Sequence, residues 1–549
     1  MPIISNFGGI IPRAAWHDLP LSNATIAHNV KLRNGKLEPW RERLAVGASV
    51  TDAVCVWYHG CCYYTFDKCV DMAEYVTDYG RLYFTGRQDY PEVAKIGSAC
   101  ALDYFRLGVP KPASVLLVSG ASSDGRNCAE RSYVYTYVNQ FGEEGAPSLP
   151  SSPITVADGT AVTVSNFEVP ASVYGVTHIN IYRTSTAWSD GSNIIQTPQT
   201  EYLLVATIPI TATIYTSTYV DTVLEKNLGS AITTEYNREP PERLREIRYL
   251  RGTGVLTGVT TNKVHFSKPY QPSNWPAEYD LTLPYNIVNI QTLGNRLFVS
   301  TDGYPFVING APNCEAHQCR AVNEVFTPLP DISCGHVNSS AATPFGMVYS
   351  SKDGLVLVSP DAKFQVITSA WFSTDDWVKI RPDTVRLAYW RGYIICVTDV
   401  IAFMLEIDAG VYNDSKISHL VTISDAPVAL TTTQSGELIM LEGNVLWQWN
   451  AGTTYREYKW TSRELNFGGT STPLACKVKT DGIQLLLIDM DGQHLYERFV
   501  PDEEPVRLKR LGRQRSWRLS FTGTGTVEYA ALGMLLNTLE GNTNNGTAI

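Results

Sequence analysis

The sequence is poor in charged residues and contains no long helical tracts. Only 18% of its 549 residues are charged, and runs rich in Ala, Glu, Lys and Leu are absent. Such runs are typical of coiled coils and long surface helices, so these architectures are excluded. Tyrosine is abundant instead, with 30 residues, and 41 glycines and 30 prolines are spread along the chain. This composition favours strands joined by turns.

No hydrophobic run is long enough to cross a bilayer. The most apolar stretch, Tyr393–Leu405, is short and is interrupted by Asp399, whereas a spanning helix needs about 20 apolar residues. The first residues, MPIISNFGG, lack the basic and apolar regions of a signal peptide. We therefore expect a chain that is made in the cytoplasm.

The 11 cysteines are odd in number and scattered, without the framework of a disulfide-rich domain. In a reducing cytoplasm we expect all of their thiols to be free. Four of them alternate with aromatic residues and are interpreted as buried apolar thiols on strands. These four are Cys55, Cys61, Cys62 and Cys69.

The motifs of common catalytic and metal sites are missing. The sequence has no G-x-S-x-G elbow, P-loop or H-E-x-x-H motif. Cys314–Cys319, with Cys334 and His336 beyond it, comes nearest to a zinc site, but free cysteines in a loop fit it better. The acidic pairs Asp375–Asp376 and Glu143–Glu144 are of a kind that turns also contain. We expect no enzymatic activity, no cofactor and no bound metal.

The formal net charge of −10 does not suit a protein that grips nucleic acid. The strongest basic cluster is Arg507–Arg515, which we interpret as a solvated strand edge. No basic stripe is visible elsewhere in the sequence.

Short apolar strands recur at a regular spacing along most of the chain. From Leu256 onward, the centres of apolar triplets that follow a turn lie 42 to 51 residues apart. A period of about 40–50 residues with several strands in each repeat is typical of β-propeller blades. We predict an all-β chain that forms a propeller of about seven blades, within a range of six to eight, closed by pairing of N-terminal with C-terminal strands. The centres are Tyr83, Leu256, Phe298, Tyr349, Ile394, Ile439 and Leu486.

The interval between Tyr83 and Leu256 is too long for one blade. The extra residues carry strand patterns of a different texture, and excising residues 113–236 restores a spacing of 49 residues. We predict that they form an inserted β-sandwich of the immunoglobulin or fibronectin type III kind. The propeller is then formed by residues 1–112 and 237–549. Proline-rich joints flank the insert at Val109–Pro112 and Arg238–Glu242.

Two N-terminal segments predict local structure. Leu21–Val30 has the features of a short helix that begins at a polar cap. Lys31–Leu37 has Asn34 and Gly35 at its middle, which is the signature of a tight hairpin.

Four motifs occur in a fixed order along the chain outside residues 113–236. They are Gly9–Leu37, with its spaced Gly, Pro-Arg, Leu-Pro and Ala-His-Asn positions; VHFSKPYQPSNWP at Val264–Pro276; LGNRLFVSTDGYPFVINGAP at Leu293–Pro312; and YKWTSRELNF at Tyr458–Phe467. In this order they resemble the tail nozzle proteins of short-tailed bacteriophages, the tail tubular protein B type. The resemblance implies a β-propeller in a sixfold ring, stacked below an adaptor ring, with DNA passing through the centre.

Such a protein is a structural part of the virion, assembled in the cytoplasm of the bacterial host. The resemblance implies a homohexameric ring that contacts the tail adaptor protein and tail fibre or tail needle proteins. DNA would pass through the lumen without sequence-specific binding, and an acidic chain suits this because it repels phosphate. The insert departs from a minimal nozzle, and bracing of neighbouring subunits and attachment of a fibre are both open roles for it.

Two long loops are candidate contact surfaces, because loops longer than about 12–15 residues in a compact fold are usually functional. They are Lys268–Asp280 and Asn309–Cys334. Trp275 is the expected anchor, with Tyr270 and Tyr279 beside it, since aromatic residues dominate interface hot spots. It is equally open that Trp275 only covers its own blade.

The 12 tryptophans and 30 tyrosines leave a second function open. They would suit a carbohydrate-binding or glycan-cleaving propeller, in which aromatic rings stack on sugars. Aromatic residues are also common in blade cores, so their number does not decide between the two functions. The mass of the native assembly separates them, because a glycan enzyme needs no sixfold ring.

Overall fold

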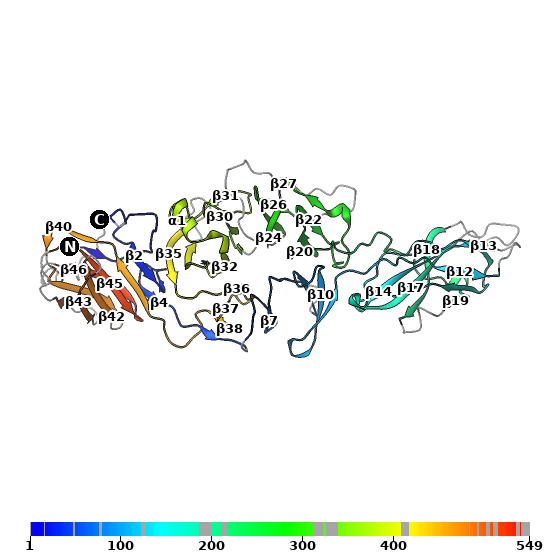
Figure 1. Ribbon diagram of the computed structural model, residues 1–549, viewed down its shortest axis with the longest axis horizontal. Coiled ribbons are helices and arrows are strands. Elements are labelled where there is room, and N and C mark those ends of the chain that lie inside the picture. Colours follow the sequence, from blue (N-terminus) through cyan, green and yellow to red (C-terminus); the bar gives the residue numbers. More distant parts are fainter. Residues whose placement is uncertain are drawn as a thin grey trace.

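The computed structural model shows an almost entirely β-stranded chain, which confirms the predicted fold class. Three parts follow one another in Figure 1: a terminal sandwich built from N-terminal and C-terminal strands, a propeller, and an insert at the far end. The structure describes the whole chain except residues 1, 16, 48–49, 76–79, 122–127, 186–198, 211–217, 311–321, 325–338, 408–416, 472, 482–483, 491–492, 501–504, 509–513, 534–538 and 540–549.

The propeller consists of small antiparallel sheets that follow one another along the chain. The first is a hairpin of β6 (Cys55–His59) and β7 (Cys62–Phe66). The second contains β8 (Asp71–Glu74), β9 (Arg81–Thr85), β10 (Glu92–Ile96) and β11 (Leu102–Arg106). After the insert, the third contains β20 (Arg245–Leu250), β21 (Val255–Val259), β22 (Lys263–Phe266) and β23 (Leu281–Thr282).

The remaining blades repeat this arrangement of four strands. The fourth has β24 (Ile287–Leu293), β25 (Arg296–Thr301), β26 (Phe306–Asn309) and β27 (Val322–Glu324). The fifth has β28 (Ser340–Thr343), β29 (Gly346–Ser350), β30 (Leu355–Val358) and β31 (Phe364–Val366). The sixth has β32 (Arg386–Trp390), β33 (Tyr393–Val397), β34 (Ala402–Ile407) and β35 (Ile417–Ile423). The seventh has β36 (Ala429–Thr432), β37 (Leu438–Glu442), β38 (Val445–Gln448) and β5 (Leu44–Ala45).

The first strands of these seven sheets make a closed ring. In the order β8, β20, β24, β28, β32, β36 and β6, each first strand contacts the next. The ring closes between β6 and β8, where the Trp57 indole N–H donates to the Val70 carbonyl at 2.6 Å. The outer strand of the seventh blade, β5, comes from the N-terminal part of the chain and pairs with β38. The described residues therefore form a propeller of seven blades, of which the first is a two-stranded hairpin.

The blades are held together by apolar faces that pack on one another. β25 is buried on both faces, as its apolar sequence RLFVST requires of a strand between two blades. One core cluster joins the third and fourth blades through residues such as Val264 and Ile290, and another joins the fifth and sixth through Leu355 and Ile394. In the described part of the chain, helix α1 (Thr374–Lys379) and five short 3-10 turns lie between strands. The turns are Ser98–Cys100, Ser172–Tyr174, Glu225–Asn227, Ala277–Tyr279 and Pro382–Thr384.

The insert pairs its strands with one another, in sheets of order β12-β16-β19, β13-β15 and β14-β17-β18. A single apolar core joins these sheets, with Tyr135, Val164 and Ile181 among its fully buried residues. The assignment to the immunoglobulin or fibronectin type III kind stays a prediction. The strands are β12 (Leu117–Gly120), β13 (Cys128–Arg131), β14 (Tyr133–Asn139), β15 (Ile154–Ala157), β16 (Val162–Ser165), β17 (Val176–Ser185), β18 (Gln199–Pro209) and β19 (Tyr219–Asp221).

The terminal sandwich contradicts the prediction that the propeller continues to residue 549. Strands after residue 457 pair with N-terminal strands in two sheets, and Trp460, Trp517 and Phe521 lie in the core between them. The apolar triplet at Leu486 misled the prediction because any paired strand, not only a blade strand, can produce that spacing. Its strands are β1 (Ile3–Ile4), β2 (Ala24–His28), β3 (Val30–Lys31), β4 (Glu38–Pro39), β39 (Tyr458–Ser462), β40 (Leu465–Ser471), β41 (Ala475–Thr480), β42 (Gln484–Met490), β43 (Gln493–Val500), β44 (Val506–Arg507), β45 (Gln514–Gly523) and β46 (Val527–Gly533).

The N-terminal segments gave one wrong and one partly correct prediction. The expected helix at Leu21–Val30 is strand β2, because its backbone groups pair with β39 and leave the local cap signal without effect. The expected hairpin forms, since β3 pairs with β4, but its loop spans residues 32–37 and is longer than the tight turn predicted. Within this loop Gly35 takes a φ of +70°, which suits glycine.

The cysteines correct the expectation that all thiols are free. Cys62 on β7 and Cys100 on the second blade form a disulfide with their Cα atoms 5.8 Å apart. Cys61 and Cys69 are exposed rather than buried, because they lie beside turns instead of in the core. Cys55 is partly buried, and its thiol donates to the Val70 carbonyl at 3.2 Å.

Candidate functional site

A cavity of about 320 Å³ lies at the centre of the propeller, where the first strands of all seven blades contribute to its wall. This convergence of strands from every blade makes it the natural candidate for a site in such a fold. The residues include Trp57 from β6, Asp71 from β8, Glu246 and Arg248 from β20, Gln291 from β24, Ser340 from β28, Arg386 from β32 and Thr431 from β36.

A chain of ion pairs crosses one side of this cavity. The Arg248 guanidinium lies 2.9 Å from the Glu246 carboxyl group and 2.8 Å from the Asp71 carboxylate, so one cation lies beside two acidic side chains. Burial, and then the Asp71 carboxylate, raise the pKa of Glu246, while Arg248 and Arg245 oppose this rise. The pair stabilises the contact of the second and third blades, because Asp71 and Arg248 come from these two sheets.

A bulge in β20 gives Glu246 its position. The register of β20 against β21 shifts between Arg245 and Arg248, and Glu246 takes a φ of +59°. Bulges re-aim side chains and are frequent next to functional sites. Here the bulge brings a carboxylate into the wall of the cavity although the strand is otherwise apolar at its buried positions.

The neighbouring sector of the cavity, on β24 and β28, carries neutral groups that bond to one another. The Gln291 amide donates to the Ser340 hydroxyl at 3.1 Å, and this hydroxyl donates to the Asn289 side chain at 2.7 Å. Arg245 donates to the Val288 carbonyl at 3.0 Å. Each of these groups already has a partner within the chain, which fits a structural role at the contacts between blades.

The central cavity is too small to be a DNA conduit. A volume of about 320 Å³ corresponds to a sphere about 8 Å across, whereas the major groove of a duplex alone is about 12 Å wide. A duplex that passes the protein must therefore pass outside the propeller centre.

The three predicted contact residues do not share a surface. Trp275 is 2% exposed and packs in a core cluster with Tyr83 and Ile247, and Tyr279 is 5% exposed in the core of the third and fourth blades. Their burial corrects the prediction that they are contact residues, because rings inside the core cannot reach a partner. Tyr270 is 67% exposed and is the one of the three at the surface.

The loop that contains Trp275 fastens the insert to the propeller. The Trp275 backbone N–H donates to the Arg238 carbonyl at 2.8 Å, on the segment that returns from the insert. The Asn274 side chain accepts from the Arg238 N–H at 3.1 Å and donates to the Asn237 side chain at 2.6 Å. On the other side, Arg81 of β9 pairs with Glu143 of the insert at 2.9 Å. The long loop thus has an internal function as a joint.

A second joint holds the terminal sandwich on the propeller. β2 lies between β35 of the sixth blade and β39 of the sandwich, so that one continuous sheet crosses from one part to the other. At the crossing the Asn29 N–H donates to the Thr422 carbonyl at 2.8 Å. Close by, the buried Asp425 carboxylate accepts from Arg43 and from Arg456.

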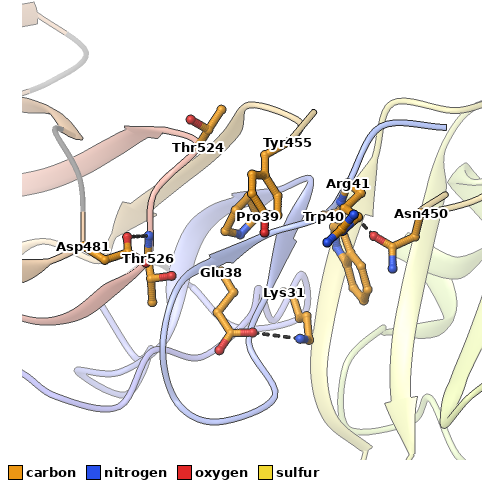
Figure 2. Close-up of a pocket in the computed structure, with 10 residues that line it drawn as sticks. All are labelled: Lys31, Glu38, Pro39, Trp40, Arg41, Asn450, Tyr455, Asp481, Thr524 and Thr526. Carbon is orange, nitrogen blue, oxygen red and sulfur yellow. Dashed lines mark hydrogen bonds and ion pairs between the residues drawn. The ribbon is translucent and has the colours of Figure 1, made fainter. Parts of the chain in front are cut away.

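A cavity of about 300 Å³ lies beside this joint. Figure 2 shows the residues that line it, with those of the β3–β4 hairpin between the two parts. Its polar groups are occupied within the chain: Lys31 pairs with Glu38 at 2.8 Å, and the Arg41 N–H donates to Asn450 at 2.7 Å. The Arg41 guanidinium also lies 5.7 Å from the centre of the Tyr455 ring. These contacts describe a joint rather than a ligand site.

The described residues contain no group of three or more His, Cys, Asp or Glu side chains that could hold a metal ion. The cysteine and histidine positions from Cys314 to His336 lie outside the described residues, as does most of the loop Asn309–Cys334. Among the helices that are described, none is both long and apolar enough to cross a membrane.

Sequence reasoning missed the charged wall of the central cavity. The signal was present in Arg-Glu-Ile-Arg at 245–248, where three charges interrupt a strand pattern directly after the insert. Asp71, the partner of Arg248, begins a strand of another blade more than 170 residues earlier in the sequence. No local sequence pattern links the two residues.

Comparisons with known proteins give a likeness to solved structures that include WD40 propellers. No protein-family model matches the chain, and no curated protein does. The Neurospora crassa Pan2 WD40 domain is 9% identical over 53% of this chain and 84% of that domain, with a TM-score of 0.25. The extracellular domain of the putative hybrid two-component system BT4673 of B. thetaiotaomicron is 10% identical over 67% of this chain and 44% of that one, with a TM-score of 0.23. Hsv2 of Kluyvelomyces marxianus is 11% identical over 56% of this chain and 90% of that one, with a TM-score of 0.19. At TM-scores this low, the propeller assignment rests on the strand order of the chain itself.

Proposed function

We propose that the protein is a structural virion component, a nozzle or hub subunit of a bacteriophage tail that assembles into a homo-oligomeric ring. The support is the ordered set of four motifs, together with where the structure puts two of them. Gly9–Leu37 and Tyr458–Phe467 are more than 400 residues apart in the sequence, and they meet as β2 and β39. The Trp460 indole N–H donates to the Gly8 carbonyl at 3.0 Å. The two motifs thus meet in the terminal sandwich, on the strand that also pairs with β35 of the sixth blade.

The single observation that carries the proposal is the continuous sheet through that joint. A sheet that runs from the sixth blade through β2 into the terminal sandwich fixes the two parts without a flexible linker. Independent domains usually meet through small polar interfaces and move relative to one another. A fixed joint suits a part that must keep its shape in a loaded assembly.

The DNA conduit in this proposal lies at the centre of the ring of chains, not within one propeller. The central cavity excludes a duplex by size. The formal net charge of −10 favours a lumen that repels phosphate and lets DNA slide. The ring is a hexamer, stacked on the tail adaptor protein in the assembled virion and in contact with tail fibre or tail needle proteins.

The experiment is native mass spectrometry and electron microscopy of the purified full chain, alone and mixed with its adaptor ring. We expect a sixfold ring, either in isolation or on the adaptor. A particle that stays monomeric with the adaptor present would contradict the proposal. A robust glycan-cleaving activity would contradict it as well.

A deletion of residues 113–236 tests whether the insert makes ring contacts. The two ends of the cut lie together, because a Cβ atom on Gly108 would be 2.8 Å from the Pro240 ring. The shortened chain is therefore expected to fold. A ring from the shortened chain places the subunit contacts on the propeller and terminal sandwich, whereas folded monomers place them on the insert.

The second candidate function, binding of carbohydrate, is favoured by one specific feature. This feature is a polar groove with an exposed tyrosine between the insert and the propeller. Binding of a carbohydrate there needs no catalytic step, so it is compatible with a structural role of the protein.

A further inference from the structure

A groove of about 540 Å³ lies where the insert meets the third blade, and its volume is within the range of small-molecule sites, about 300–1,000 Å³. Its walls come from β9, from the turn after β14, from the segment that returns from the insert, and from the loop after β22. The residues are Arg81, Gly142, Glu143, Glu144, Thr233, Thr234, Asn237, Lys268, Tyr270, Gln271, Pro272 and Ser273.

Tyr270 is held in an unusual conformation at the edge of this groove. Its φ is +61°, a value that is rare for a bulky residue, and its side chain is 67% exposed. Its N–H donates to the Gly254 carbonyl at 2.8 Å. The ring lies over Gly254, where a Cβ atom would be only 2.8 Å from it. Strain of this kind persists where the surroundings enforce it, and it is concentrated at functional sites.

Thr234, one of the residues that line the groove, carries a buried hydroxyl group. The Thr234 hydroxyl is buried, and among the described residues it has no hydrogen-bond partner. A buried polar group without a partner costs free energy, so a ligand or a water molecule that bonds to it is favoured. The Asn237 amide beside it is fixed in orientation, since it donates to the Glu144 carbonyl at 2.9 Å.

The charges of the groove balance one another. Arg81 pairs with Glu143 at 2.9 Å, and its guanidinium lies 4.7 Å from the centre of the Phe141 ring. Glu144 accepts from the Tyr182 hydroxyl at 2.8 Å, and Lys268 supplies the second positive charge of the groove. An anionic ligand would face two carboxylates, and a cation would face two basic groups. The groove therefore favours an uncharged ligand that is rich in hydroxyl groups.

We propose that this groove binds a neutral saccharide. A sugar ring has an apolar C–H face that can pack on the exposed face of Tyr270, and a rim of hydroxyl groups that both donate and accept. The Thr234 hydroxyl and the carboxylate oxygens of Glu143 and Glu144 provide partners for that rim. The site is separate from the ring assembly proposed above, and neither depends on the other.

The cavity of Figure 2 provides an internal comparison, because it also combines a tyrosine with polar side chains. There the Arg41 guanidinium lies near the Tyr455 ring, and the neighbouring amide and carboxylate groups bond within the chain. Tyr455 is 52% exposed, so Tyr455→Ala removes an exposed tyrosine of similar kind without touching the groove.

The test is binding of the full chain to a printed panel of neutral and charged oligosaccharides, followed by calorimetric titration of the strongest binders. We expect at least one neutral oligosaccharide to bind. Tyr270→Ala is expected to weaken it at least tenfold and Thr234→Val several-fold, while Tyr270→Phe and Tyr455→Ala leave it within a factor of two. Far-ultraviolet circular dichroism and the thermal midpoint confirm that each variant is folded.

Four results would overturn the proposal. They are no binding to any neutral member of the panel, binding restricted to charged glycans, and equal binding by the Tyr270→Ala variant. The fourth is a folded Tyr270→Ala variant that loses both saccharide binding and ring assembly. That result would make Tyr270 a contact between subunits. Because assembly is measured on the same samples, failure of the saccharide site and failure of the ring are distinguished.

Discussion

Trp275 and Tyr270 are five residues apart in one loop, and the structure gives them opposite roles. Trp275 lies in the core, and its indole N–H donates to the Pro272 carbonyl at 2.8 Å. Tyr270 presents its ring to solvent. The difference arises from the segment that returns from the insert at Asn237 and Arg238. This segment bonds to Asn274 and Trp275 and leaves Tyr270 open to solvent.

Replacing these two residues separates a core role from a surface role. We expect Trp275→Ala to lower the free energy of unfolding by about 3–5 kcal/mol, as for other buried aromatic residues. Tyr270→Ala is expected to change it by about 0.5 kcal/mol. Urea denaturation followed by circular dichroism measures both values. A Trp275→Ala chain as stable as the wild type but unable to assemble would instead restore Trp275 as a contact residue.

Glu246 makes the stability of the propeller depend on pH. Its folded pKa is raised, chiefly by burial, so its protonated form is favoured in the folded state. This contribution is fully present below the unfolded pKa, about 4.3, and it is lost as the pH rises through the folded pKa. We expect Glu246→Gln to flatten the fall in stability between pH 5.5 and 8.5 by on the order of 1–2 kcal/mol.

The measurement is urea denaturation at pH 5.5, 7 and 8.5 for the wild type, Glu246→Gln and Glu278→Gln. Glu278 is an exposed residue of the third blade, so its replacement controls for the loss of a carboxylate as such. A Glu246→Gln profile parallel to that of the wild type would show that Arg248 keeps Glu246 ionised throughout this range.

At the scale of elements, the N-terminal segment before β2 also approaches β35 of the sixth blade very closely. A Cβ atom on Gly9 would be 2.3 Å from the Leu420 carbonyl oxygen and 2.7 Å from its nitrogen. Only glycine fits there, which explains its position in the opening motif. Gly80, by contrast, has nothing within 4 Å of an added Cβ atom.

Gly9→Ala should therefore disturb the joint, and Gly80→Ala should not. We expect Gly9→Ala to cost about 1–3 kcal/mol, as overpacking in a rigid region does. We also expect faster hydrogen exchange at the amide of Asn29, which donates across the joint to the Thr422 carbonyl. Hydrogen exchange with mass spectrometry detects this effect. Unchanged exchange in Gly9→Ala would show that the continuous sheet does not fix the two parts.

The sequence predicted those elements whose signal is local. Blade spacing and the hairpin at Gly35 depend on apolar runs and turn residues close in the chain, and both the blades and the hairpin are present in the structure. Leu21–Val30 was mistaken for a helix because its partner, β39, lies more than 400 residues away. The strands after residue 457 were mistaken for a blade for the same reason, since their partners are N-terminal.

The candidate sites were less predictable than the fold. The ion pairs of the central cavity join Asp71 to Arg248 across the whole insert, so only the closed ring brings them together. The burial of Trp275 depends on the segment that returns from the insert, and the sequence motif around Trp275 contains no sign of that segment. The aromatic content of the loop indicated that it makes contacts, but it did not show whether they are made within the chain or with another protein.

At the scale of the whole molecule, the arrangement in Figure 1 places the insert and the terminal sandwich at opposite ends of the propeller. Both are attached by several contacts rather than by single linkers, at Arg81 and Trp275 on one side and at β2 on the other. In a ring of such chains, the parts available for contact with other proteins are the blade rims and the two ends. In the proposed ring, the DNA would pass between the chains and not through the central cavities of the propellers.

The last expectation concerns DNA and follows from size and charge together. The propeller centre is too narrow for a duplex, and the chain has a formal net charge of −10. A protein that grips DNA neutralises phosphates with basic groups, and its affinity falls steeply with salt. We expect the purified chain to bind a 20-base-pair duplex with a dissociation constant above about 100 µM at 150 mM salt. This affinity is weaker than the usual range of non-specific DNA binding. Fluorescence anisotropy of a labelled duplex at 50, 150 and 300 mM salt measures this. Micromolar binding that weakens steeply with salt would reveal a basic surface and contradict a conduit in which DNA slides.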